Sequence, residues 1–236
     1  MELIHITRKL RENIEELRFS APVDYVYNPL IYAEKPHFEY IKKYGQSPKE
    51  IILLGMNPGP FGMAQTGVPF GDVPSVRDWM GIEEEVGKPE RENPKRPVLG
   101  FACPRREASG KRLWGWAQER YGAPENFFRR FYVINYCPLC FLQESGRNFT
   151  PDKIPIVQRK PMLEICNQAF RTMVEVLQPE YVIGVGAFAE KQAIASLRGV
   201  EVRVGRIPHP SPANPASNYG WAKNAEKAFE DIGINL

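Results

Sequence analysis

Two asparagines and one histidine stand where strands of a buried sheet are expected to end. Asn57 follows the run EIILLGM, Asn135 ends the run FYVIN, and His209 follows the run VEVRVGRIP. Because ligands bind beyond the carboxyl ends of the strands in open α/β sheets, we expect these three side chains to meet in one site. Amides and an imidazole can orient a substrate, but they supply no strong base and no activated nucleophile. The site therefore suits a reaction whose leaving group departs readily.

The stretch around Asn57 reads GMNPGPFGMAQTGVPFG over residues 55–71 and is dense in glycine and proline. Glycine lets a backbone approach a ligand without a clash from Cβ, and proline fixes the shape of a turn. The phosphate-binding pattern G-x-x-x-x-G-K-[ST], the nucleophile pattern G-x-S-x-G and a carboxylate pair do not occur at the expected strand ends. The sequence therefore argues against a P-loop nucleotide hydrolase and against a serine hydrolase.

Runs of β-branched and aromatic residues alternate with helical patterns along the chain. The strand runs are EIILLGMN, FFRRFYVINYCPL, EYVIGVGA and VEVRVGRIPHP, and the helical patterns are KPMLEICNQAFRTMVEVL, FAEKQAIASL, WAKNAEKAFEDIGI and an N-terminal helix marked by Leu3, Ile6, Leu10, Ile14 and Leu17. Such alternation predicts βαβ units and a parallel sheet that is covered on both faces. The expected fold class is α/β, a three-layer α/β/α sandwich around a central, mostly parallel four-stranded sheet. We expect residues 1–236 to form one domain.

The composition limits the class of partner only loosely. The chain has 236 residues and a formal net charge of +3, which allows a nucleic-acid partner without requiring one. No apolar run approaches the roughly 20 residues of a membrane span, and the charged N-terminal segment lacks the apolar core of a signal peptide. We therefore expect an intracellular protein, in the cytoplasm or nucleoid if the source is bacterial.

Two features leave alternatives open. Residues 72–112 are irregular, and from Lys88 to Arg112 eight Lys and Arg stand against three Glu, which indicates either a solvated loop or a flank that contacts phosphates. Cys137 and Cys140 form a C-x-x-C pair, which is compatible with a metal or an iron–sulfur cluster. The other two cysteines are isolated and the histidines are distant in sequence, so we favour reduced, buried thiols and expect no metal.

Four stretches of the chain together resemble the uracil-DNA glycosylase superfamily, and most closely its single-strand-selective monofunctional branch. They are GMNPGPFGMAQTGVPFG, RPVLGFACPRREASGKRLWGW, VINYCPL and HPSPANP, and the resemblance runs from about Ile51 to Trp221. It implies hydrolysis of the N-glycosidic bond of uracil and 5-substituted uracils, such as 5-hydroxymethyluracil, in DNA. The product is an abasic site, which initiates base excision repair. The resemblance implies no cofactor and no metal, DNA in single- or double-stranded form as partner, and a monomer.

The resemblance also implies a role for each site residue. Asn57 would orient the attacking water, and His209 would donate a hydrogen bond to the negative charge that develops on the base O2. Asn135 would read the base through O4 and N3–H, which cytosine does not offer. Phe70 would stack on the flipped base. Met56 and Gly59 would line the base pocket, with space near Gly59 for a 5-substituent.

The HPSPANP loop would enter the DNA beside the flipped nucleotide. Ser211 would contact a phosphate, and Pro212, Ala213 and Asn214 would follow it in the loop. Ala213 departs from many relatives of the superfamily, which carry a bulky or basic residue here. Since a methyl group cannot fill the gap left by a flipped base, double-strand action requires another wedge, such as Pro212 or Asn214.

Two other functions remain open at this stage. One is a glycosylase directed at mismatched uracil or thymine, or at the deaminated purines xanthine and hypoxanthine. The other, of a different class, is a DNA-lesion-binding module without turnover, against which the intact set of Asn57, Asn135 and His209 argues.

Overall fold

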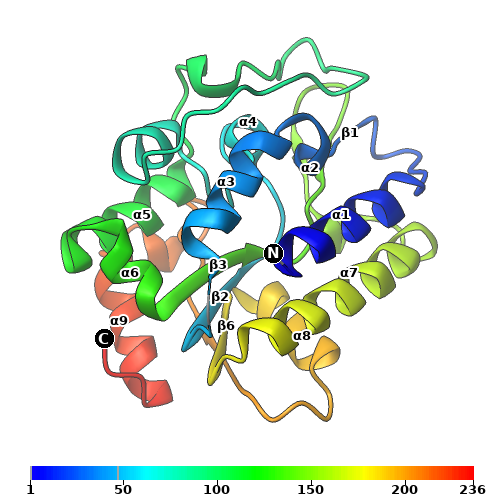
Figure 1. The fold of residues 1–236 in the computed structure, drawn as a ribbon. Coiled ribbons are helices and arrows are strands. Elements are labelled where there is room, and N and C mark those ends of the chain that lie inside the picture. Colours follow the sequence, from blue (N-terminus) through cyan, green and yellow to red (C-terminus); the bar gives the residue numbers. More distant parts are fainter. Residues whose placement is uncertain (1, 47) are drawn as a thin grey trace.

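Four parallel strands form the central sheet of the computed structural model, which describes residues 2–46 and 48–236 (Figure 1). They are β2 (Ile51–Gly55), β3 (Phe131–Asn135), β6 (Tyr181–Val185) and β7 (Arg203–Ile207), in the order β3-β2-β6-β7. The register pairs Gly55 with Asn135, and Val185 with Ile207. The carboxyl ends of all four strands therefore meet at one edge of the sheet.

The burial of the strands explains why their sequences are continuous apolar runs. Every residue of β2, β3 and β6 is buried, whereas β7, at the edge, has exposed residues at Arg203 and Arg206. A strand covered on both faces has no solvent side, so it shows no alternation of polar and apolar residues.

Helices cover both faces of the sheet. Helices α1 (Glu2–Glu15), α7 (Ile156–Leu177) and α8 (Ala187–Ser196) lie on one side, and α5 (Ala108–Tyr121), α6 (Pro124–Arg130) and α9 (Trp221–Ile232) lie on the other (Figure 1). Helix α3 (Glu34–Tyr44) packs beside β3, where the Tyr40 hydroxyl donates to the Val133 carbonyl at 3.0 Å. The predicted three-layer α/β/α sandwich is confirmed.

A second, antiparallel sheet was not predicted. It consists of β1 (Tyr25–Tyr27), β4 (Cys140–Leu142) and β5 (Asn148–Phe149), in the order β1-β4-β5. Its strands have two or three residues each, too few for a periodic pattern to be visible in the sequence. The chain passes from β3 into β4 within five residues, so this sheet lies close to the carboxyl edge of the central one.

Two boundaries differ from the sequence prediction. The FFRR part of the run FFRRFYVINYCPL belongs to α6, because Pro124 begins a helix that continues to Arg130 before β3 starts. Helix α5 begins at Ala108, inside the segment expected to be irregular. Short helices complete the fold: α2 (Pro29–Tyr32), α4 (Met63–Thr66), a π-turn (Ser75–Trp79), and 3₁₀ turns at Gly100–Ala102, Pro151–Lys153 and Pro215–Ser217. Within the described ranges, no helix is both long enough and apolar enough to cross a membrane.

Candidate active site

A cavity of about 320 Å³ opens at the carboxyl edge of the central sheet. Of the site residues predicted from the sequence, it brings together Met56, Asn57, Gly59, Phe70, Asn135, His209 and Ser211. Pro212, Ala213 and Asn214 do not line it and lie farther along the same loop. The lining residues that the sequence prediction did not assign to the site are Pro60, Gly62, Met63, Glu107, Ser109, Asn148 and Thr150.

The amide of Asn57 is held in one orientation by main-chain carbonyls. Its Nδ2 donates to the Leu139 carbonyl at 3.1 Å and to the Pro58 carbonyl at 3.3 Å. Leu139 lies just before β4, so the small sheet fixes this side chain from outside the central sheet. Because both amide hydrogens point to protein oxygens, Oδ1 is left as an acceptor.

The amide of Asn135 is fixed by its packing at the end of β3. Asn135 is buried, and its Nδ2 lies 3.3 Å from the Met63 sulfur, a weak acceptor that a better one can replace. A Cβ at Gly55, its neighbour in the sheet, would lie 2.3 Å from Asn135 Oδ1 and 2.6 Å from Phe70 Cε2. Glycine at position 55 therefore leaves room for the Asn135 amide and the Phe70 ring at the end of β2.

Phe70 adopts a backbone conformation that is rare for a residue with a side chain, with φ of +53°. Its carbonyl accepts hydrogen bonds from the Trp114 indole at 3.1 Å and from the Asp72 amide at 2.7 Å. Its ring centroid lies 6.1 Å from that of His209, with the rings inclined by 40°. Backbone strain of this kind persists only where the surroundings hold it, and it is common at binding sites.

Asp72 connects the Phe70 turn to the start of α5. The carboxylate is fully buried and accepts from the Arg106 guanidinium at 2.6 and 2.7 Å, from the Ser75 hydroxyl at 3.2 Å and from the Glu107 amide at 3.1 Å. A buried carboxylate with this many donors is satisfied by its network rather than by water. Asp72 therefore fixes the distance between two walls of the cavity.

Glu107 places a single carboxylate in the cavity wall, from the start of α5 and not from a strand end. Its oxygens cap α5 by accepting from the amides of Ser109 and Gly110. A Cβ at Gly62 would lie 2.7 Å from Glu107 Cγ, and one at Gly59 would lie 3.7 Å from Oε1. Burial raises the pKa of Glu107, and the two amides oppose that rise. No helix was predicted at α5, so the sequence prediction did not point to Glu107.

The protonation of His209 follows from its surroundings. Burial lowers the pKa of His209 to about 4, so the ring is neutral near pH 7. Its Nδ1 lies 3.0 Å from the Ser211 amide and accepts that hydrogen bond, so the ring hydrogen sits on Nε2. Gly186, with φ of +94°, makes room for the ring, because a Cβ there would lie 3.2 Å from His209 Cβ. The site thus presents a neutral imidazole as a donor.

Two further polar residues, on and after β5, face the cavity. Asn148 belongs to β5, and Thr150 follows that strand. The Asn148 Oδ1 atom is buried and has no hydrogen-bond partner among the described residues. Such atoms in native structures are normally satisfied by water or a ligand. The two-residue strand that carries Asn148 left no signal in the sequence.

Many basic side chains of the 88–112 segment have partners within the protein. Lys88 contacts Glu92 and the Val98 carbonyl, Arg96 and Arg105 lie over the ring of Phe61 at 5.3 and 4.5 Å, and Arg106 binds Asp72. These contacts favour a structural role for those side chains over a phosphate-contacting flank.

The thiols of the C-x-x-C pair belong to different parts of the fold. Cys137 packs in the main hydrophobic core, with its sulfur 3.6 Å from that of Met162, whereas Cys140 packs under the small sheet. Burial raises the pKa of Cys140 to about 12, which disfavours the thiolate that a metal needs. In the part of the chain that is described, no group of three or more His, Cys, Asp or Glu residues is arranged to hold a metal ion.

The chain is similar to known proteins over nearly its whole length. Residues 42–232 match the family model described as the uracil DNA glycosylase superfamily. The chain is 48% identical over 228 residues to the single-strand selective monofunctional uracil-DNA glycosylase of Rattus norvegicus, covering 96% of this chain and 82% of that protein. The corresponding Bos taurus enzyme is 47% identical, with 96% and 84% covered.

The fold is also similar to that of a solved structure, SMUG2 of Pedobacter heparinus. The two superpose with a TM-score of 0.66 at 20% identity, covering 97% of this chain and 98% of that one. At this identity the likeness concerns the fold alone. The family match and the two close relatives carry the assignment: the chain belongs to the uracil-DNA glycosylase superfamily.

Proposed function

We propose that the protein is a monofunctional uracil-DNA glycosylase that removes uracil from DNA and leaves an abasic site for base excision repair. The observation that carries this proposal is the convergence of Asn57, Asn135 and His209 on one cavity, each with its hydrogen-bonding atoms fixed. The relatives named as uracil-DNA glycosylases support the same activity. A flipped nucleotide is the form in which a base can enter such a cavity.

Departure of the base is the step in which His209 acts. As the bond between C1′ of the sugar and N1 of uracil breaks, negative charge collects on the base. The Nε2–H of the neutral ring donates a hydrogen bond to O2, where part of that charge develops. A preorganised donor of this kind is worth about 3–4 kcal/mol. The fixed bond from Ser211 to Nδ1 keeps the donor on the correct nitrogen without a rearrangement during the reaction.

Water attacks the sugar after the base has begun to leave. Asn57 Oδ1 accepts a hydrogen bond from this water and holds it in line with C1′, while the Leu139 carbonyl keeps the amide in place. An amide cannot deprotonate water, so its contribution is position. A sugar that already carries positive charge needs no stronger nucleophile. The reaction consumes one water and yields free uracil and an abasic sugar.

Asn135 selects the base. Its Nδ2 exchanges the weak Met63 contact for uracil O4, and its Oδ1 accepts from N3–H. Cytosine presents a donor at position 4 and no N3–H, so the same amide faces two mismatched groups. An unmade hydrogen bond at a buried group costs about 1–3 kcal/mol. Phe70 stacks on the flat face of the accepted base.

We extend the substrate range to 5-substituted uracils such as 5-hydroxymethyluracil. Gly59 has no side chain to block position 5, and Glu107 stands behind it as an acceptor. A hydroxymethyl group can donate to that carboxylate, whereas the methyl of thymine would cover it without a hydrogen bond. We assign Glu107 to this wall rather than to the attacking water because its oxygens already hold the first turn of α5.

We further propose that residues 1–236 act as one catalytic domain and as a monomer. The cavity is formed by side chains of a single chain, from Met56 to Ser211. DNA as substrate supports an intracellular location, in the cytoplasm or nucleoid if the source is bacterial.

The test is abasic-site formation on matched single- and double-stranded oligonucleotides that carry one U, 5-hydroxymethyl-U, T, C, xanthine or hypoxanthine. We expect uracil and 5-hydroxymethyluracil to be excised, thymine to be slower than 5-hydroxymethyluracil, and cytosine to be untouched. Faster excision of mismatched thymine, or of the purines, than of uracil would identify a different glycosylase. Tight binding of uracil DNA without any abasic product would indicate a lesion-binding module and overturn the proposal.

A further inference from the structure

Tyr219 is an aromatic side chain that the fold leaves almost wholly in water. Its exposed fraction is 87%, the largest among the exposed large hydrophobic side chains of the described residues. A single exposed apolar residue requires no explanation by itself. The position of Tyr219 makes its exposure notable, because Tyr219 belongs to the segment that runs from His209 at the active site to α9.

Hydrogen bonds bring the residues around Tyr219 back onto the HPSPANP loop. The Asn218 Nδ2 donates to the Pro212 carbonyl at 3.1 Å, and the Trp221 indole donates to the Pro208 carbonyl at 2.7 Å. The Ser217 hydroxyl donates to the carbonyl of His209. Tyr219 lies between two of these anchored residues, so its backbone is tied to the loop that carries the cavity-lining His209 and Ser211.

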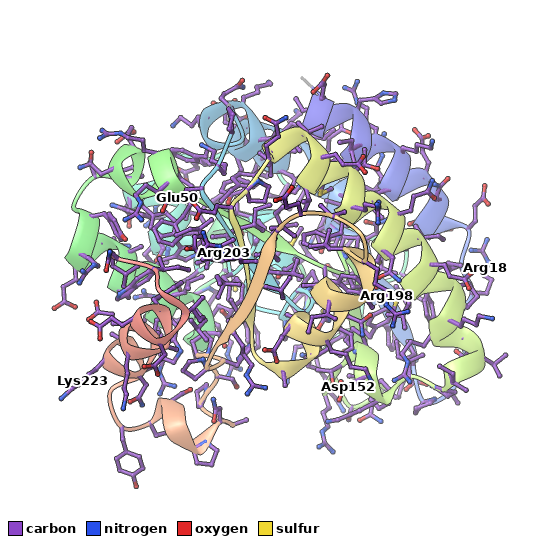
Figure 2. The ribbon with its side chains drawn as sticks, turned by 90° about the horizontal axis from the view of Figure 1, so that it is seen from below. Arg18, Glu50, Asp152, Arg198, Arg203 and Lys223 are labelled. Carbon is purple, nitrogen blue, oxygen red and sulfur yellow. The ribbon has the colours of Figure 1, made fainter. Side chains whose placement is uncertain are left out.

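Arg112 of α5 links the start of this segment, at Pro210, to its later part, at Asn218. Its guanidinium donates to the Pro210 carbonyl at 2.8 Å and to Asn218 Oδ1 at 3.1 Å. The segment between β7 and α9 lies at the edge of the molecule, next to Lys223, whose side chain points into solvent (Figure 2). A preorganised loop loses little conformational entropy when a ligand orders it, and a cation beside it suits a phosphate backbone.

The wedge position of the same loop is occupied by Ala213, which is exposed and carries only a methyl group. When a nucleotide leaves the stack, the base beside it loses a stacking partner. An aromatic ring can replace that partner whatever the sequence, because every base has a flat π-face. We propose that Tyr219 stacks on the base adjacent to the flipped nucleotide and supplies the contact that Ala213 cannot make. This inference rests on the proposed glycosylase function.

The experiment compares the wild type with Tyr219→Ala and Tyr219→Phe in uracil excision below saturation, on single-stranded oligonucleotides. Alanine should lower kcat/KM by about 5- to 150-fold, the equivalent of about 1–3 kcal/mol of lost stacking. Phenylalanine should stay within about 3-fold of the wild type, because it keeps the ring. Since the side chain is exposed, neither variant removes core packing, and circular dichroism checks that both are folded.

A second substrate separates stacking from other effects of Tyr219. In this oligonucleotide, abasic analogues replace both bases that flank the uracil, so no neighbouring base is left to stack. The ratio between the wild-type and Tyr219→Ala rates should then fall to near one. An unchanged ratio on this substrate, or equal rates for alanine and wild type on the normal strand, would overturn the inference. Excision of the unmodified strand by the wild type tests the proposed function itself, so a failure there is distinguishable.

Discussion

At the scale of a single side chain, the hydrogen bond to His209 determines which nitrogen of its ring carries the hydrogen. Its Nδ1 is occupied by the Ser211 amide, which leaves the hydrogen on Nε2, and the residue lines the cavity. Protonation would place a second hydrogen on Nδ1 and break the bond to Ser211. The loop that begins at His209 would lose one of its anchors. A neutral ring therefore serves both the chemistry and the position of the loop.

This charge state predicts a pH dependence of stability. Burial lowers the pKa of both His209 and His37 to about 4, whereas a histidine of the unfolded chain titrates near 6.5. Between these values the unfolded state binds more protons, so the free energy of unfolding falls as the pH falls from about 6.5 to 4. Each histidine contributes on the order of 3 kcal/mol at most over this range.

Urea denaturation at a series of pH values measures this effect, with His209→Gln as the comparison. The variant should show a shallower slope than the wild type between pH 6.5 and 4, because one of the two histidines with a lowered pKa is gone. Parallel slopes would mean that His209 titrates in the folded protein as it does in the unfolded chain, and that burial does not lower its pKa.

Among single residues, the sequence predicted well those cavity-lining side chains that stand at or just after the end of a central strand. Asn57, Asn135 and His209 stand at strand ends that the apolar runs make visible, and the structure brings all three to one cavity. Glu107 and Asn148 were missed because a helix cap and a two-residue strand leave no periodic pattern. Their approach to the cavity depends on tertiary packing, which a single sequence does not show.

At the scale of elements, the register between β2 and β3 sets the relative positions of the residues to which we assign base recognition. Gly55 pairs with Asn135, and the Phe70 ring closes over both from the following turn. The three groups come from two strands and a loop, so their relative positions depend on how closely the strands can pack. A glycine at the end of β2 allows the closest approach.

Gly55→Ala tests this arrangement. The added Cβ would lie 2.3 Å from Asn135 Oδ1, so the amide and the ring must both move. A misplacement of about 1 Å costs on the order of 100-fold in rate, and we expect a loss of that size in single-turnover uracil excision. Overpacking should lower the free energy of unfolding by about 1–3 kcal/mol.

Gly115→Ala is the matched control. Gly115 lies in α5, and a Cβ there would meet nothing within 4 Å. This variant should keep wild-type activity and gain about 0.5–1 kcal/mol of stability, because alanine costs less conformational entropy in a helix. Full excision activity in a folded Gly55→Ala protein would show that the contact among Gly55, Asn135 and Phe70 does not position the base.

Length alone does not explain which elements the sequence predicted, because the 14-residue α5 and the 11-residue α3 were not predicted, whereas the 10-residue α8 was. The strands β2, β3, β6 and β7 were predicted from their β-branched and aromatic runs, and the helices α1, α7, α8 and α9 from their helical patterns. The start of α6 was missed because Phe127 and Phe128 read as strand residues, although Pro124 begins a helix. There, tertiary packing of the aromatic rings overrides the local preference for a strand.

At the scale of the whole molecule, the site lies between two sheets. The central sheet supplies Asn135 and leads to Asn57 and His209, while the small antiparallel sheet supplies Asn148 and lies beside the Leu139 carbonyl that holds Asn57. The sequence predicted the first sheet and not the second. The orientation of the Asn57 amide, which we propose holds the attacking water, thus depends on a part of the fold that only the structure revealed.

The central claim is that the protein binds a flipped uracil and positions a water without deprotonating it. Asn57→Ala tests it most directly, by single-turnover excision and equilibrium binding of the same single-stranded uracil oligonucleotide. Removing the amide takes away the water position and leaves Asn135, His209 and Phe70 in place. We predict binding within about 3-fold of the wild type and an excision rate at least about 100-fold lower. A rate near that of the wild type would contradict the account.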